Sequence, residues 1–438
     1  MGASSTERLT RSVHHHRSTG EPMATLGAIA DDLTGATDLA ITLTSAGFRT
    51  TVVLGADADG ERRTLDAVTD GADAVVVALK SRTMPVDEAV KVSLDALAWL
   101  RGAGCERFYV KYCSTFDSTS DGNIGPVSEA VLEALGEEVT VIAPAFPANR
   151  RTVYRGHLFV GDQPLDESPM RHHPLTPMTD SNLLRLLEPQ VSRGADDVAL
   201  VPWPVVAEGA DAVRAAIGAA RESGARFVVV DALRDADLRT LAAATDDLRL
   251  LTGGSALAQG LTGPRSDDLA EFALPGGPRV VLSGSASRAT QGQVRHALSL
   301  GAGRRIRAAE LRSDFDSVVS AAVTAALDSE DVPFVVYATA SPEDVVDTAD
   351  APVIEQALAE IAERLVAAGT RALLVAGGET SGAVVRRLGV GSLALGPEVD
   401  PGVAWMRGLR DGEDIHLMLK SGNFGAEDLF VRAWEEGA

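Results

Sequence analysis

The sequence predicts an α/β protein of two domains, each a mainly parallel sheet flanked by helices, with the active site in the interdomain cleft. Two observations support this prediction. Short apolar runs alternate with amphipathic stretches from Thr25 onward, which is the pattern of repeated βαβ units. The chain also has 438 residues, more than a single hydrophobic core usually organises.

The expected elements follow one another in strand–loop–helix order. In the first half we expect strands near residues 25–30, 50–54, 73–79, 106–111 and 138–143, and helices near 36–46, 86–101 and 124–135. A proline-rich stretch at 144–179 has few regular signals, and irregular stretches of that length are often functional. In the second half we expect strands near 279–283, 333–338, 371–375 and 415–419, and helices near 288–299, 315–327, 352–368 and 380–388.

Composition shifts divide the chain into four segments. Residues 1–23 are rich in Ser, Thr, Arg and Gly and predict a disordered N-terminal extension, in which three consecutive histidines from His14 are not expected to hold a metal. Residues 24–261 form the first predicted domain, and 279–438 form the second. The turn-rich stretch 262–278 between them predicts a linker.

Composition also excludes several classes of protein. A formal net charge of -22 argues against nucleic-acid binding, which needs a basic face. No apolar run approaches the roughly 20 residues that cross a bilayer, and the first residues lack the apolar core of a secretory signal. With only two cysteines there is no disulfide framework, so we expect a reducing, cytoplasmic setting.

Two adjacent aspartates, Asp31 and Asp32, follow the first predicted strand and precede a helix. One aspartate suffices to cap the helix, so the pair predicts a second role, either accepting a proton from a substrate hydroxyl or binding a metal–phosphate complex. Which of the two is the base stays open. The loop lacks the G-x-G-x-x-G pattern, which disfavours a nicotinamide-linked oxidoreductase.

Cations and hydroxyls follow the next two strands. Lys80, Arg82 and Lys111 stand at strand ends that converge on one sheet edge, which suits a carboxylate ligand that Arg82 can bind through two hydrogen bonds. The run after Lys111 supplies groups suited to a polyol, and it also reads as a turn before a helix capped by Asn123. The candidate substrate-binding residues in this run are Ser114, Asp117 and Ser118.

Three turns rich in glycine and serine follow strands of the second half. Such turns at helix N-termini present free N–H groups to phosphate, so together they predict a nucleotide site. None is a Walker A loop, because no G-x-x-x-x-G-K-[ST] pattern occurs. The candidate residues are Ser285, Ser287, Gly377, Gly378, Glu379, Thr380 and Gly422.

Four of these stretches resemble the four-carbon acid sugar kinase family. They are Ile29–Ala36, Lys111–Thr119, Gly122–Gly125 and Met170–Pro174. The Tyr-Cys-Ser-Thr-Phe-Asp-Ser-Thr and Arg-His-His-Pro runs are similar to the branch of that family that acts on 3-oxo-tetronate. The resemblance extends from about Leu26 to Phe430, and residues 1–23 have no counterpart in it.

The resemblance implies an N-terminal acid-sugar-binding domain and a C-terminal nucleotide-binding domain. ATP, with Mg²⁺, would phosphorylate the 4-hydroxyl of 3-oxo-tetronate, and Asp31, Arg82 and the Lys111 loop would contact that substrate. Ser285 or Ser287 would contact ATP, together with the residues from Gly377 to Thr380 and Gly422. The implied partners are the acid sugar and ATP, with no nucleic acid and no membrane, and a homodimer.

Three other functions stay open at this point. Threonate or erythronate kinase is the closest, since both belong to the same family. A sugar-acid-binding regulator without catalysis would use the same first domain. A nicotinamide-linked oxidoreductase is disfavoured because the G-x-G-x-x-G pattern of dinucleotide-binding loops is absent after the first predicted strand.

Overall fold

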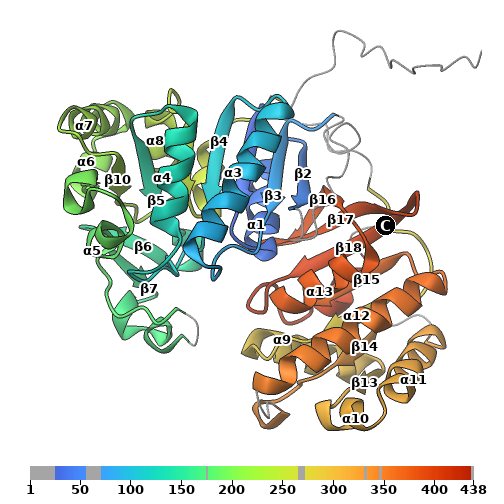
Figure 1. The fold of residues 1–438 in the computed structure, drawn as a ribbon. Coiled ribbons are helices and arrows are strands. Elements are labelled where there is room, and N and C mark those ends of the chain that lie inside the picture. Colours follow the sequence, from blue (N-terminus) through green and yellow to red (C-terminus); the bar gives the residue numbers. More distant parts are fainter. Residues whose placement is uncertain are drawn as a thin grey trace, which may run out of the picture.

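The computed structural model describes residues 25–55, 71–173, 176–264, 272–329, 333–344 and 348–435. They form two lobes (Figure 1), which we call the N-terminal lobe (25–264) and the C-terminal lobe (272–435). The predicted extension at 1–23 and the middle of the predicted linker lie outside the described residues. Within the described part, no helix is both long and apolar enough to cross a membrane.

The N-terminal lobe alternates strands and helices as expected. Its main strands are β1 (Leu26–Ala30), β2 (Thr50–Leu54), β3 (Ala74–Ala78), β4 (Arg107–Lys111), β5 (Thr140–Ala143), β9 (Val198–Val201), β10 (Phe227–Val230) and β11 (Leu250–Gly253). Its helices are α1 (Leu33–Ser45), α3 (Val86–Gly102), α4 (Ile124–Leu135), α5 (Leu183–Leu187), α6 (Trp203–Val206), α7 (Ala210–Glu222) and α8 (Asp235–Ala244). The main strands are aliphatic and mostly buried because helices cover both faces of the sheet.

The C-terminal lobe follows the same plan and adds an antiparallel section. Its strands are β12 (Val280–Ser283), β13 (Gly303–Arg305), β14 (Phe334–Tyr337), β15 (Ala372–Ala376), β16 (Ser392–Asp400), β17 (Val403–Arg410) and β18 (Glu413–Lys420). Its helices are α9 (Arg288–Leu300), α10 (Ala308–Ser313), α11 (Phe315–Leu327), α12 (Ala351–Ala367), α13 (Gly378–Leu388) and α14 (Leu429–Arg432).

The α/β class with mainly parallel pairing is confirmed, and the two lobes share one continuous sheet. The strand order is β13-β14-β12-β15-β18-β17-β16-β2-β3-β1-β4-β11-β5-β10-β9. All strand pairs are parallel except β18–β17, β17–β16 and β16–β2. The β16–β2 pair joins the lobes edge to edge, with Leu393 opposite Val52.

The hydrophobic core crosses the joint between the lobes. One cluster of buried side chains covers a single face of the sheet in both lobes and includes Leu39 of α1, Val52 of β2, Val384 of α13 and Leu393 of β16. Two further clusters cover the opposite face, one beneath α3 and α4 and the other around Trp405, where α9 and α14 pack. Helix α1 contacts β16, β17, β18 and α13, so it packs across the joint.

Two antiparallel groups of strands were not predicted, and β9, β10, β11 and β13 were not placed individually. The proline-rich stretch contains a small antiparallel sheet of β6 (Arg151–Tyr154), β7 (His157–Val160) and β8 (Gln163–Pro164), whose strands are too short to give a period-two pattern. The β16–β17 pair was also missed, because shifts in its register between Leu395 and Asp400 interrupt the alternation of buried and exposed side chains.

Shortening a side chain at the joint tests whether the two lobes share stability. We expect Leu393→Ala to lower the free energy of unfolding by about 2–5 kcal/mol, because the side chain is fully buried and its loss leaves a cavity. Denaturant unfolding followed by tryptophan fluorescence measures this. The matched control is Leu409→Ala on β17, which is 58% exposed and should change stability by about 0.5 kcal/mol or less. Equal losses in the two variants would contradict a shared core.

Candidate active site

The predicted site residues fall at the places where strand order reverses. In the N-terminal lobe β1 lies between β3 and β4, and in the C-terminal lobe β12 lies between β14 and β15. The loops that leave the carboxyl ends of such strands form the crevice where open α/β sheets bind ligands. The loops after β1, β3 and β4 carry the predicted acid-sugar residues, and those after β12, β15 and β18 carry the predicted nucleotide residues.

Arg82 forms the centre of a charged cluster with the two aspartates. Its Nε and Nη2 donate to the two carboxylate oxygens of Asp31 at 2.8 and 2.9 Å, and Nη2 also lies 2.7 Å from Asp32 Oδ2. Its Nη1 lies 3.9 Å from Asp117 Oδ2. The edge of the guanidinium predicted to bind a substrate carboxylate is therefore occupied by Asp31, and Nη1 is the part of Arg82 with the most remaining donor capacity.

Asp32 combines the structural role of a cap with an unusual acidity. Its Oδ1 accepts from Gly35 N at 2.5 Å as the N-cap of α1. Burial raises the pKa of Asp32, and the Asp31 carboxylate adds to the rise, while Arg82 and Lys111 oppose it. The result is a carboxylate that accepts a proton more readily than an ordinary aspartate does.

Lys111 lies beneath the N-terminal end of α1. It is 3% exposed, and its Nζ donates to the Tyr112 carbonyl at 2.9 Å. Another carboxylate, Asp38, was not predicted; it interacts with this ammonium and accepts from Ser255 Oγ at 2.5 Å. Burial raises the pKa of Asp38. Asp38 lies within α1 and was not singled out, because a lone aspartate in a predicted helix usually faces solvent.

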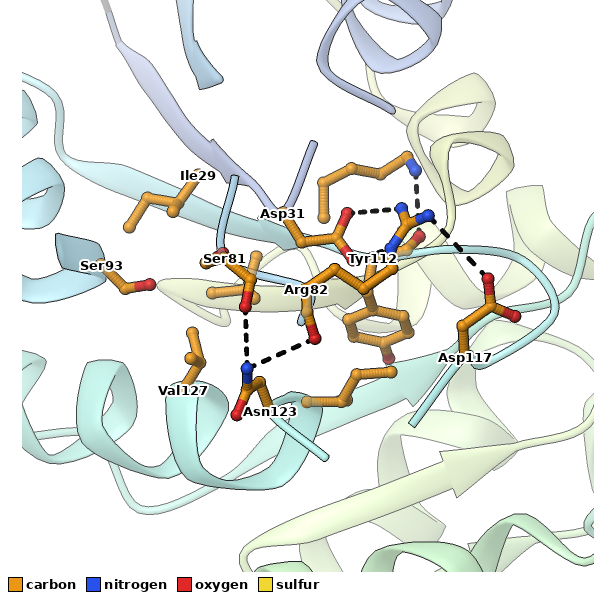
Figure 2. A pocket seen from close by; sticks show the side chains of 12 residues that line it. Ile29, Asp31, Ser81, Arg82, Ser93, Tyr112, Asp117, Asn123 and Val127 are labelled. Atoms are coloured by element: carbon orange, nitrogen blue, oxygen red, sulfur yellow. Dashed lines mark hydrogen bonds and ion pairs between the residues drawn. The ribbon is translucent and has the colours of Figure 1, made fainter. Parts of the chain in front are cut away.

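A small pocket lies beside this cluster (Figure 2). Asp31, Arg82, Lys111 and Asp117 line it, but Ser114 and Ser118 are not among its described lining residues. Ser118 instead is buried and donates to Gln190 Oε1 at 2.7 Å. The structure therefore brings four of the six predicted substrate residues to one pocket.

Asn123 stands at the N-cap position of α4 but makes no side-chain cap. Its Nδ2 donates instead to the carbonyls of Ser81, Arg82 and Met84, at 2.7, 3.3 and 2.9 Å. These bonds hold the loop after β3 and so place the Arg82 guanidinium against the aspartates (Figure 2). The predicted capping role of Asn123 was therefore wrong, and its actual partners come from a loop that is distant in sequence.

In the C-terminal lobe the loops after β12 and β18 are in direct contact. Ser287 caps α9 by accepting from Thr290 N at 3.2 Å, and its Oγ donates to the Gly422 carbonyl. Thr290 Oγ1 donates to the same carbonyl at 2.7 Å. A Cβ on Gly422 would lie 2.6 Å from Ser285 Oγ, so any larger residue would displace the Ser285 side chain.

The N-terminus of α13 has no side-chain cap. Its N-cap is Gly377, with φ +122°, and this residue provides no side-chain hydrogen bond. The N–H groups of the first helical turn have no intrahelical acceptor. Gly378 and Glu379 are exposed, so these donors and the positive end of the helix dipole are open to an anion.

The two groups of loops meet at the N-termini of α1 and α13. A Cβ on Gly378 would lie 2.9 Å from Thr34 Oγ1, in the first turn of α1. Lys80 Nζ, after β3, lies 3.0 Å from Glu379 Oε2 in the first turn of α13. The helix that Asp32 caps therefore begins next to the helix end that is open to phosphate.

The sequence also gave no sign of the role of Lys420, the last residue of β18. It is 1% exposed, and its Nζ donates to Thr290 Oγ1 at 2.8 Å and to Gln293 Oε1 at 2.6 Å. Burial lowers the pKa of its amine to about 7. Lys420 stands two residues before Gly422. Of this turn, only the glycine was among the predicted site residues.

Comparison with known proteins matches both lobes to family models. Residues 26–261 match the model described as a sugar-binding N-terminal domain, and residues 280–430 match the nucleotide-binding C-terminal domain. The chain belongs to the four-carbon acid sugar kinase family that these two domains define.

Individual relatives and solved structures agree with this membership. The chain is 48% identical to the 3-oxo-tetronate kinase of Cupriavidus necator, covering 93% of this chain and 96% of that one. It is 45% identical to the 3-oxo-tetronate kinase of Pectobacterium atrosepticum, covering 95% and 100%. A crystal structure from Salmonella typhimurium LT2, described provisionally as a tRNA synthase, superposes with a TM-score of 0.83 at 39% identity, covering 94% and 100%. A Haemophilus influenzae protein does so with a TM-score of 0.76 at 39% identity and the same coverage.

A methyl group at Gly422 tests the convergence of the C-terminal loops. We expect Gly422→Ala to raise the Kd for ATP about tenfold, or about 1.4 kcal/mol, because the new Cβ would push Ser285 out of place. Isothermal titration measures this. The matched control is Gly102→Ala at the end of α3, where a Cβ meets nothing within 4 Å and ATP affinity should not change. Unchanged affinity in Gly422→Ala would remove that residue from the nucleotide site.

Proposed function

We propose that the protein is an ATP-dependent kinase that transfers a phosphoryl group to the 4-hydroxyl of 3-oxo-tetronate. The single observation that carries the proposal is the 48% identity to a 3-oxo-tetronate kinase over nearly the whole of both chains. The geometry supports it, because a pocket lined by Arg82, Lys111 and aspartates adjoins a helix end suited to phosphate.

The acid sugar would bind in the N-terminal lobe. Its carboxylate would be attracted by Lys111 and by Nη1 of Arg82, whose contact with Asp117 is long at 3.9 Å. Asp31 would hold Arg82 in place through its two hydrogen bonds. Asp32, with its raised pKa, would take the proton of the 4-hydroxyl.

The nucleotide would bind in the C-terminal lobe, with its phosphates at the open N-terminus of α13. The 4-oxygen of the sugar forms a bond to the γ-phosphorus as the bond from that phosphorus to the β–γ bridging oxygen breaks, and ADP leaves. Ser285 is our candidate for contact with ATP, because Ser287 already caps α9 and binds the Gly422 carbonyl.

Mg²⁺ would arrive with the phosphates. The described residues contain no group of three acidic, histidine or cysteine side chains able to hold a metal ion by themselves. This fits Mg²⁺, which usually binds through one or two carboxylates together with substrate phosphates. Asp31 and Asp32, at the N-terminus of the helix that adjoins α13, are our candidate carboxylates for the ion, which would neutralise phosphate charge there.

The second candidate is a kinase for threonate or erythronate. Ser114 and Ser118, which the resemblance associates with the 3-oxo branch, are not among the described residues lining the pocket, so the geometry does not separate these substrates. The net charge of -22 gives no support to a tRNA partner. A homodimer and a cytoplasmic location remain predictions, the first testable by sedimentation.

A substrate panel tests the proposed function. Purified protein with ATP and Mg²⁺ should form ADP with 3-oxo-tetronate and much less with threonate or erythronate, measured by a coupled ADP assay. A preference for threonate or erythronate would select the second candidate. A sugar acid that binds without ADP formation would indicate a regulator.

The carboxylate of Asp32 is tested by replacing it with its amide. We expect Asp32→Asn to lower kcat about 10²–10⁴-fold, because general-base catalysis is lost. The fold should persist, since the amide oxygen still accepts from Gly35 N. Asp95→Asn, a 68% exposed surface position on α3, is the control and should keep full activity. Near-normal turnover in Asp32→Asn would leave Asp31 as the candidate base.

The acidity of Asp32 predicts the pH profile. A base works only when deprotonated, so kcat/KM should fall as pH drops through its raised pKa. The acidic limb of the profile should therefore lie above the ordinary value of 3.8. Measuring kcat/KM with 3-oxo-tetronate between about pH 4 and 8 checks this, at a pH range where circular dichroism shows the protein folded. A limb at or below the ordinary aspartate value would argue against Asp32.

A further inference from the structure

Lys420 is a buried amine with no acidic partner among the described residues. Its Nζ bonds the neutral oxygens of Thr290 and Gln293, and it lies 5.6 Å from the centre of the Phe430 ring. Burial is the one resolved influence on the pKa of its amine, and no carboxylate among the described residues opposes it. Burying a charge without a counter-charge is costly, so a lysine here needs a compensating role.

Lys420, Ser287 and Thr290 all donate hydrogen bonds to the Gly422 carbonyl. Nζ lies 3.4 Å from this oxygen, which also accepts from Ser287 Oγ and Thr290 Oγ1. Three donors on one oxygen fix the direction of the carbonyl toward the interior of the lobe. In a trans peptide the following N–H points the opposite way, so the N–H of Asn423 points away from the buried donors.

Asn423 is exposed, and in the described part of the chain its N–H makes no hydrogen bond. It adjoins the position where Gly422 approaches Ser285. A reversed peptide would present a carbonyl oxygen to this side, and an oxygen repels phosphate. The orientation of one peptide therefore decides whether the turn attracts or repels an anion.

We propose that Lys420 is a positioning residue for the nucleotide: it holds the Gly422–Asn423 peptide so that the N–H, and not the carbonyl, faces the phosphates. The proposal rests on the nucleotide half of the proposed function. Lys420 itself stays covered by protein and does not touch the ligand, since it is 1% exposed.

The rest of the turn is held by the same cluster. Gln293, whose Oε1 accepts from Lys420, donates through Nε2 to the carbonyls of Phe424, Gly425 and Ala426, at 3.0, 2.9 and 2.9 Å. Lys420 thus fixes the orientation of Gln293 as well as the Gly422 carbonyl. Lys420 and Gln293 together bond every carbonyl of the turn from 422 to 426 except that of Asn423.

The test measures nucleotide binding without turnover. In the full-length protein, Lys420→Met should raise the Kd for ATP with Mg²⁺ at least tenfold by isothermal titration with no acid sugar present. In the kinase assay, KM for ATP should rise while KM for 3-oxo-tetronate stays within twofold. The melting temperature should hold, because replacing a buried charge by an apolar side chain of similar length is often neutral or stabilising.

Two further variants complete the test. Lys91→Met on α3, where the lysine is 75% exposed, is the matched control and should leave ATP affinity unchanged. Thr290→Val removes a hydroxyl that joins Lys420 to the Gly422 carbonyl, and it should weaken ATP binding even if Lys420→Met does not fold. Unchanged ATP affinity in a folded Lys420→Met, or in Thr290→Val if that variant is the only one to fold, would overturn the proposal. Because the titration needs no acid sugar, wild-type protein that binds ATP but phosphorylates none of the sugar acids would refute the proposed function and leave this test intact.

Discussion

The pairing of β2 with β16 is the constraint on which the rest of the site depends. Three successive antiparallel pairs, β2–β16, β16–β17 and β17–β18, reverse the direction of the parallel strands from one lobe to the other. In a flat sheet this reversal would place the two sets of carboxyl-end loops at opposite edges. Twist offsets it: the six steps from β1 to β15 accumulate about 120–150° at about 20–25° each. The loops after β1 and β15 are thereby returned to one side, where Thr34 and Gly378 come into contact.

The charges of the site follow from this placement. An aspartate pair at a helix N-terminus would repel an incoming triphosphate if it stood alone. Arg82 lies against both carboxylates, and Lys111 lies beneath them, so these two cations offset the charge of the aspartate pair before any ligand binds. Positioned charges that need no rearrangement during the reaction are the main means by which enzymes stabilise phosphoryl transfer.

The sequence predicted the residue types of the site better than their partners. The loops after β1, β3 and β4 could be found because polar residues ended apolar runs, and the pocket contains Asp31, Arg82, Lys111 and Asp117. The two hydrogen bonds from Arg82 to Asp31 could not be predicted from the sequence. They depend on the position of the Arg82 loop, which is held by Asn123, 41 residues further along the chain. The pairing of β2 with β16 could not be predicted either, because strand order across the lobes depends on contacts between residues far apart in sequence. The irregular register of β16 also removes the alternation of buried and exposed residues by which a strand is recognised. The domain boundaries themselves stay a prediction.

The shared sheet also limits how the site can open. A hinge between two independent domains would close over ATP as a rigid body, but here such a motion would strain the β2–β16 hydrogen bonds and the core that α1 spans. The ion pair of Lys80 and Glu379 is the contact that can break at little cost in free energy. Both side chains are 65% exposed, and exposed ion pairs contribute about 0–1 kcal/mol. A phosphate at the N-terminus of α13 would compete with the Glu379 carboxylate for Lys80. If the phosphate displaced Glu379, Lys80 would pair with the phosphate. If the proposed site is correct, ligand entry would need exchange of side-chain partners at the mouth of the site more than rotation of the lobes, because the shared sheet joins the two halves of the site.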